Sequence, residues 1–134
     1  MANVYYLYEK DQGIGPKFIG TLYRTGYDDY EFVYGENATY EIRTMIERMP
    51  IRNEPYKKDV IDKVLMDSVS PPRGTKLHEV MCRQDGIPID TCRWEFLDKH
   101  WDFMHKLKPG TRAPLDTSMG NVNFYKEKVS YGRE

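Results

Sequence analysis

The side chains best suited to bind a metal ion lie between residues 78 and 105. His78 and Cys82 are four positions apart, so a helix would place them on one face. Three further residues could complete a ligand set: Cys92, His100 and His105. Structural zinc sites usually contain cysteine pairs with only two to four residues between them, whereas these two cysteines are ten positions apart. The spacing permits a metal site without specifying one, and we expect no metal or other cofactor.

Cys92 offers a second kind of chemistry, that of a cysteine nucleophile. In the first turn of a helix, the helix dipole would lower the pKa of its thiol. A nucleophilic cysteine also needs a neighbouring imidazole as its base, and no hydrolase signature surrounds Cys92. Free cysteines are commonly small buried apolar residues, so we expect Cys92 to pack beside Trp94 and Phe96.

Carboxylates and imidazoles that could act as acids and bases alternate with rings in the next segment: Asp98, His100, Asp102 and His105. The same segment carries apolar residues at the spacing of one helical face: Trp94, Leu97, Trp101 and Met104. If that stripe faces the core, Asp98, Lys99, Asp102 and Lys106 form the solvated face. We therefore expect no catalytic residue, and an enzyme that uses His78, Cys82, Cys92 or His100 stays open only as an alternative.

Charge and cysteine content exclude several classes of protein. Twenty basic and twenty-one acidic side chains give a net charge of −1, so no strong field attracts nucleic acid or an anionic membrane. Two cysteines are too few for the disulfide framework of a small secreted domain. The N-terminus lacks the pattern of a secretory signal, and no stretch approaches the ~20 apolar residues that span a bilayer. We expect a cytosolic protein that contacts neither nucleic acid nor membrane.

The first 35 residues have the pattern of an antiparallel sheet. Three runs rich in aromatic and β-branched residues, at 4–8, 18–23 and 30–34, are separated by turn clusters at 11–16 and 25–29. This pattern predicts a three-stranded meander. Alternation places Tyr30, Phe32 and Tyr34 on one face of the third strand.

The apolar period changes to that of helices after Gly35. The first helix is predicted over 38–49, with Asn37 as its N-cap and Pro50 as its end. A second helix opens near Glu54–Pro55, since proline suits the first turn.

Two more helices are predicted before residue 108. Thr75 caps a short third helix that carries Leu77, Val80 and Met81. Asp90 or Thr91 caps the fourth, which contains the Trp94 stripe.

The fold class is therefore α+β, in a single domain of 134 residues that lies near the commonest domain size. Its parts are a meander at 1–35, a helical part at 36–107 and an irregular tail at 108–134. The tail contains one further strand within 122–130, where Val122–Tyr125 and Val129 are apolar or aromatic.

A surface rich in tyrosine is the best candidate for contact with a partner. Both faces of the first strand are apolar, so one face can pack on the helices while the other presents rings to a partner. Tyrosine suits such a role because it offers a large rigid ring and a polar tip. The residues assigned to this surface are Tyr6, Tyr8, Tyr27, Asp28, Asp29 and Tyr30.

The N-terminal pattern resembles the small N-terminal domain of HipA-type toxin kinases. The resemblance rests on a first strand that ends in Leu-Tyr, on Gly20-Thr21-Leu22 and on the aromatic strand 30–34. It covers residues 3–35, with similar later pieces at Pro71-Pro72-Arg73 and 87–91. The kinase core of that family is missing, because the chain has no phosphate-binding glycine loop and no catalytic Asp-x-x-x-x-Asn. The resemblance implies a separate regulatory piece and no phosphotransfer.

The function expected from the sequence is binding and regulation of another protein, without catalysis. The resemblance makes an antitoxin-like partner of a separate kinase one form of this function. A second form is an accessory protein of a phage or mobile element that inhibits a host enzyme by direct contact. Size and aromatic content fit both forms equally.

Overall fold

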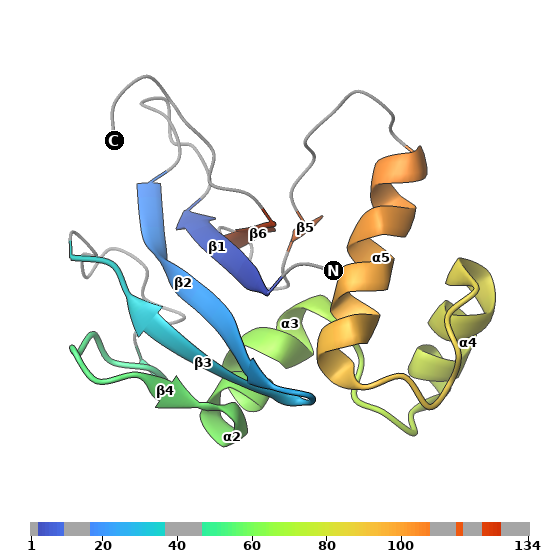
Figure 1. Ribbon diagram of the computed structural model, residues 1–134, viewed down its shortest axis with the longest axis horizontal. Coiled ribbons are helices and arrows are strands. Elements are labelled where there is room, and N and C mark those ends of the chain that lie inside the picture. Colours follow the sequence, from blue (N-terminus) through green and yellow to red (C-terminus); the bar gives the residue numbers. More distant parts are fainter. Residues whose placement is uncertain (1–2, 10–16, 37–46, 108–114, 117–121, 127–134) are drawn as a thin grey trace.

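The computed structural model describes residues 3–9, 17–36, 47–107, 115–116 and 122–126. Figure 1 shows a mixed α+β arrangement, with the strands on one side and the long helix α5 packed against them. The helix predicted over 38–49 lies outside the described residues, except for its last three positions. Those three, Glu47–Met49, form a turn before Pro50.

Six strands form one sheet in the order β4-β3-β2-β1-β6-β5, and every neighbouring pair is antiparallel. Their bounds are β1 Val4–Glu9, β2 Lys17–Gly26, β3 Asp29–Tyr34, β4 Tyr56–Lys57, β5 Leu115–Asp116 and β6 Val122–Tyr125. The predicted meander is confirmed as β1–β3. The late strand is confirmed at 122–125, while residues 127–130 of that prediction lie outside the described part. Two short edge strands, β4 and β5, were not predicted.

Close packing within the sheet follows from the alternation of β3. Tyr30, Phe32 and Tyr34 are buried, whereas Glu31 and Val33 between them are half-buried. Gly20 of β2 lies opposite Tyr34 in the antiparallel register. A Cβ at Gly20 would stand 2.4 Å from the carbonyl oxygen of Val33 and 2.6 Å from the Phe32 ring. The aromatic strand therefore requires a glycine beside it.

One continuous helical segment, 58–69, changes its hydrogen-bond pattern in the middle. It consists of α2 Lys58–Ile61, the π-helical turn η1 Asp62–Met66 and α3 Asp67–Val69. The prediction that this helix opens near Glu54–Pro55 is wrong, because Tyr56 and Lys57 pair with β3 as strand β4 before the helix begins.

The other two helices are α4 Lys76–Asp85 and α5 Arg93–Leu107. Thr75 caps α4 as predicted, since its hydroxyl accepts the His78 N–H at 3.2 Å. The expectation that Asp90 or Thr91 caps α5 is wrong: the Phe96 N–H donates to the Cys92 carbonyl at 2.9 Å, so Cys92 is the N-cap. No helix in the described part of the chain is long and apolar enough to cross a membrane.

The core lies between the sheet and α5. The Trp94 ring meets Tyr5 of β1 and Tyr30 of β3 at centroid distances of 5.4 and 5.6 Å, and Trp101 meets Tyr5 at 6.1 Å. Such aromatic pairs add about 0.5–1.5 kcal/mol each beyond the area that they bury. The predicted apolar stripe of α5 thus packs against the rings of the meander.

The expectation that Asp98 of α5 lies on the solvated face is also wrong. Its side chain is buried, with 1% of the residue exposed. The Tyr5 hydroxyl donates to its carboxylate, and the Lys126 ammonium stands 3.4 Å from the same oxygen. Burial, followed by the charge of Asp98, raises the pKa of the Tyr5 hydroxyl far above its usual value. A buried carboxylate is stable here because β1 supplies a donor and the end of β6 supplies a cation.

Replacement of Asp98 by alanine should be strongly destabilising. It leaves the buried Tyr5 hydroxyl without its acceptor, whereas Lys126 keeps Asp102 at 2.6 Å, so the loss should be about 3 kcal/mol, the low end for breaking a buried pair. Urea unfolding followed by circular dichroism measures the change in the free energy of unfolding. Tyr5→Phe is the matched variant and should cost less, about 1.5 kcal/mol, because it removes one hydrogen bond to a carboxylate that Lys126 still pairs. Equal losses for the two variants would contradict a structural role for the carboxylate.

Candidate partner-binding surface

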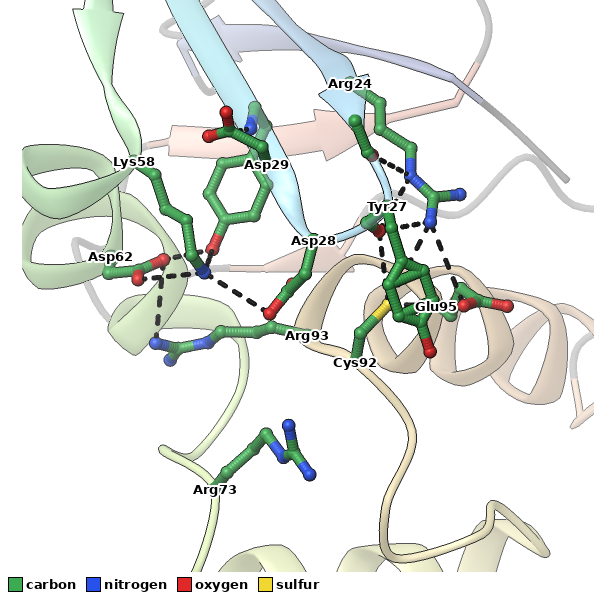
Figure 2. A network of polar contacts seen from close by, with 12 residues as sticks. Arg24, Tyr27, Asp28, Asp29, Lys58, Asp62, Arg73, Cys92, Arg93 and Glu95 are labelled. Atoms are coloured by element: carbon green, nitrogen blue, oxygen red, sulfur yellow. Dashed lines mark hydrogen bonds and ion pairs between the residues drawn. The ribbon is translucent and has the colours of Figure 1, made fainter.

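The turn between β2 and β3 carries the most exposed aromatic side chain of the described residues. Tyr27 is 66% exposed at the tip of this hairpin. Arg24 fixes the backbone of the tip, since its guanidinium donates to the Gly26 carbonyl at 2.8 Å and to the Tyr27 carbonyl (Figure 2). The Arg24 guanidinium also lies 5.8 Å from the centroid of the Tyr27 ring. The ring is thus open to solvent while the backbone beneath it is held in place.

The tip rests on the first turn of α5. The Cys92 thiol lies 3.5 Å from the Tyr27 carbonyl and 3.2 Å from the Glu95 carboxylate, and Arg24 lies 3.8 Å from that carboxylate. The Glu95 backbone N–H also bonds to the Cys92 sulfur. The Cys92 sulfur therefore caps the first turn of α5 in the place of the usual hydroxyl, and the Glu95 carboxylate contacts the same thiol. Burial raises the pKa of this thiol, so it is held as the neutral form.

A lysine holds the other flank of the tip. The Lys58 ammonium lies 3.6 Å from Asp28, 3.3 Å from Asp62 and 3.2 Å from the Tyr30 hydroxyl (Figure 2). The Tyr30 hydroxyl donates to Asp62. Burial, assisted by Asp62, raises the pKa of Tyr30 well above its usual value. The hairpin is thereby joined to the helical segment 58–69 as well as to α5.

Arg93, the first residue of α5, is buried between that segment and Ser70. Its guanidinium donates to Asp67 at 2.5 Å and to the Ser70 carbonyl at 2.9 Å, and it lies 3.9 Å from Asp62. Residues five apart in an α-helix point about 140° away from each other. The π turn makes this difference much smaller, because the Asp67 N–H bonds to the Asp62 carbonyl five residues earlier. One arginine can therefore contact both carboxylates.

The structure separates the six residues that the sequence assigns to a partner surface. Tyr27 and Asp29 are exposed, whereas Tyr6 and Asp28 are half-buried. The assignment of the other two to an exposed surface is wrong. Tyr30 is fully buried because its ring packs on Trp94 and its hydroxyl reaches Asp62, and Tyr8 is 4% exposed between Phe18 and Tyr125.

Exposed aliphatic residues of α4 and of the loop before α5 were not predicted as a site. Leu77 and Val80 of α4 are 60% and 45% exposed, and Ile89, in the loop before α5, is 57% exposed. The buried face of α4 instead contains His78 and Cys82. The helical spacing shows that Leu77 and Val80 lie on a different side of α4 from His78 and Cys82. This spacing could have indicated exposed aliphatic residues, but apolar residues were assumed to face the core.

An open groove runs beside α4, which we call the α4 groove. Its volume is about 410 Å³, and its lining includes Asp67, Val69, Pro71, Pro72, Leu77 and Met81. The groove joins the end of the helical segment 58–69 to the start of α4. Asp67, which lines the groove, also accepts a hydrogen bond from Arg93.

The residues considered for metal or thiol chemistry occupy separate places. The His78 Nε2 atom is 3.6 Å from the Cys82 sulfur, whereas His100 bonds to Asp85 at 2.6 Å and Cys92 lies under the hairpin tip. Among the described residues, no group of three or more His, Cys, Asp or Glu is arranged to hold a metal ion. The side chain of His105 lies outside this description. Burial raises the pKa of the Cys82 thiol too, as it does for Cys92.

The sulfur cap of α5 predicts an unusual tolerance at Cys92. Cys92→Ser should leave the free energy of unfolding within about 0.5 kcal/mol or increase it, because serine is a preferred N-cap. Cys92→Ala should reduce it by about 1 kcal/mol, because the Glu95 N–H loses its acceptor. Urea unfolding of the two variants measures the difference. Equal destabilisation by serine and alanine would show that packing, and not capping, decides the role of the sulfur.

The buried phenols predict loss of stability in alkali. Tyr5 and Tyr30 have raised pKa values in the folded state, so this state keeps their protons above pH 10, where an unfolded tyrosine loses its proton. Their contribution is complete below about pH 10 and is lost as the pH rises further. The urea midpoint should fall between pH 9 and 11 in the wild type. The fall should be smaller in the double variant Tyr5→Phe/Tyr30→Phe, and an unchanged fall would contradict this origin.

Comparisons with known proteins give no information about the function of this chain. No family model, no curated protein and no solved structure matches it. The hairpin tip, the exposed aliphatic residues of α4 and the α4 groove are therefore the features on which a function can be argued.

Proposed function

We propose that this chain is a non-enzymatic domain that binds and regulates another protein, with the hairpin tip as its main contact. The observation that carries the proposal is the exposed Tyr27 ring on a backbone fixed by Arg24 and Cys92. Interface residues with large effects on affinity are often tyrosines, tryptophans or arginines that fill pockets of the partner. Because its backbone is already fixed and a tyrosine side chain has few rotatable bonds, Tyr27 loses little conformational freedom on binding.

Charge around the tip supports a specific choice of partner. Asp29 is exposed next to the tip, and its carboxylate accepts the Tyr30 N–H at 3.0 Å, which fixes its orientation. Asp28 shares Lys58 with Asp62. A partner with a basic rim around a pocket for the Tyr27 ring would complement this arrangement.

Two kinds of partner fit the proposal. The resemblance to the N-terminal domain of HipA-type toxin kinases favours a separate kinase, for which the chain would act like an antitoxin. A host enzyme inhibited by a phage or mobile-element protein is the alternative. The buried, neutral thiols of Cys82 and Cys92 give no support to a thiol-dependent enzyme.

Tyr27→Ala should abolish capture of the partner without loss of the fold. Affinity purification of the tagged chain from lysate of its native host, with quantitative mass spectrometry, should recover one stoichiometric protein with the wild type. Loss of a central aromatic contact of at least 2 kcal/mol corresponds to a roughly 30-fold weaker complex. The identity of the captured protein then distinguishes a kinase from another enzyme.

Phe18→Ala provides the matched control, because Phe18 is a 36% exposed aromatic residue at the opposite end of β2. This variant should keep the partner. Circular dichroism and urea unfolding establish that both variants are folded. Equal recovery of the partner by Tyr27→Ala and the wild type would exclude the tip as the contact, and the absence of any stoichiometric partner would exclude the proposed function in this lysate.

A further inference from the structure

We propose that the α4 groove is a second binding site, which takes a peptide segment of a partner protein. The segment inserts a large apolar side chain beside Leu77 and Met81 and places a lysine or arginine against Asp67. The inference goes beyond the proposed function, because the groove shares no residue with the hairpin tip. Each site can therefore fail without the other.

The apolar part of the groove is suited to one or two side chains. Its volume of about 410 Å³ lies at the small end of the ~300–1,000 Å³ range of ligand sites. Val69, Pro71 and Pro72 line it together with Leu77 and Met81, which are one helical turn apart on α4. Leu77 is 60% exposed, so a ligand would remove its apolar surface from water.

Asp67 gives the groove an acidic end. The ionic network beside it contains three carboxylates, Asp28, Asp62 and Asp67, and two cations, Lys58 and Arg93. One negative charge within this group is therefore unbalanced. Asp67 is its most exposed carboxylate, with 43% of the side chain accessible, so it is the member that a ligand can reach.

The helix to which Asp67 belongs adds to this preference. Asp67 lies in the last turn of the segment 58–69, where the carbonyl end of the helix carries a partial negative charge. A carboxylate at this end is unfavourable unless cations offset it, and Arg93, whose side chain is only 10% exposed, pairs with Asp67. The opposite wall begins at α4, where Thr75 caps the positive end of the helix, and Asp67 is the only charged side chain among the described residues that line the groove. A basic ligand group at Asp67 is therefore favoured over an acidic one.

The polar framework of the groove is already in place without a ligand. Arg93 holds Asp67 at 2.5 Å and the Ser70 carbonyl at 2.9 Å. The Thr75 hydroxyl donates to the Pro72 carbonyl at 2.8 Å, which fixes the loop between Ser70 and α4. A preformed groove binds a peptide at a smaller entropic cost than one that must be ordered.

Selection from a phage-displayed library of random 12-residue peptides tests the proposal. The immobilised wild type is used for selection and the Leu77→Asp variant for removal of peptides that bind elsewhere. The expected consensus is a large apolar residue close to a lysine or arginine. The most enriched peptide, synthesised with a fluorescent label, is then titrated by fluorescence polarisation, together with a version in which its basic residues are glutamate.

Three variants locate the binding. Leu77→Asp should weaken the labelled peptide at least tenfold, and Asp67→Asn, which keeps an acceptor for Arg93, should weaken it several-fold. Val80→Asp is the matched control, since Val80 is an exposed α4 residue that is not among those lining the groove. It should change the affinity less than twofold. Urea unfolding of each variant separates loss of binding from loss of folding.

Several outcomes would overturn the inference. An acidic consensus, or preference for the glutamate version of the peptide, would contradict the proposed charge of the ligand. Equal weakening of binding by Val80→Asp would contradict the proposed location of the site. No enrichment over the Leu77→Asp counter-selection would exclude a peptide ligand. If sedimentation then shows a dimer that Leu77→Asp dissociates, the occupant is a second copy. The Tyr27→Ala experiment is unaffected by these results, so failure of the groove and failure of the proposed function are distinguished.

Discussion

The buried guanidinium of Arg93 is the constraint on which this end of the molecule depends. A guanidinium removed from water must have acceptors around it, because an unpaired buried charge costs several kcal/mol. Ser70 provides a carbonyl, and the π turn brings Asp62 and Asp67 to the same side of their helix. Asp62 in turn binds Lys58 and Tyr30 beneath the hairpin tip, while Asp67 lines the α4 groove. The position of one side chain thus relates both proposed sites.

A second buried ionic contact holds the other part of α5 to the sheet. Asp98 receives the Tyr5 hydroxyl and the Lys126 ammonium, one from β1 and one from the residue after β6. Asp98 and Arg93 are five positions apart on α5, and each contacts elements that the other does not reach. Aromatic packing of Trp94 fills the space between them. Hydrophobic contact alone would allow α5 to slide along the sheet, whereas two directional contacts fix its position.

The sequence predicts features that depend on local pattern. The β1–β3 meander, the Thr75 cap of α4 and the apolar stripe of α5 were all recognised because alternation, capping and helical spacing act over a few residues. Strand β4 was missed because its two residues pair only through contact with β3. Alternation places Tyr30 on the face of Phe32 and Tyr34, and Asp98 follows Trp94 by one helical turn, so both lie on core-facing sides. The polar partners that make their burial possible are 32 and 93 positions away, and no local pattern reveals those partners. Among the candidate site residues, Tyr27 and Asp29 were correctly placed at the surface, while the exposed Leu77 of α4 was not considered.

The α4 groove lies where local pattern and observed burial disagree, and this disagreement has a physical meaning. A helix that satisfies only its own fold buries its aliphatic residues and exposes its polar ones. In α4 the order is partly reversed, since His78 and Cys82 are buried while Leu77 and Val80 face water. Among the described residues, none provides a hydrogen-bond partner for the buried His78 Nδ1 atom, which is unfavourable for stability. The helix still packs on α5 through His78, Cys82 and Phe96, but Leu77 and Val80 leave apolar surface in water. Contact with a partner that covers Leu77 would supply the apolar burial that the isolated domain lacks.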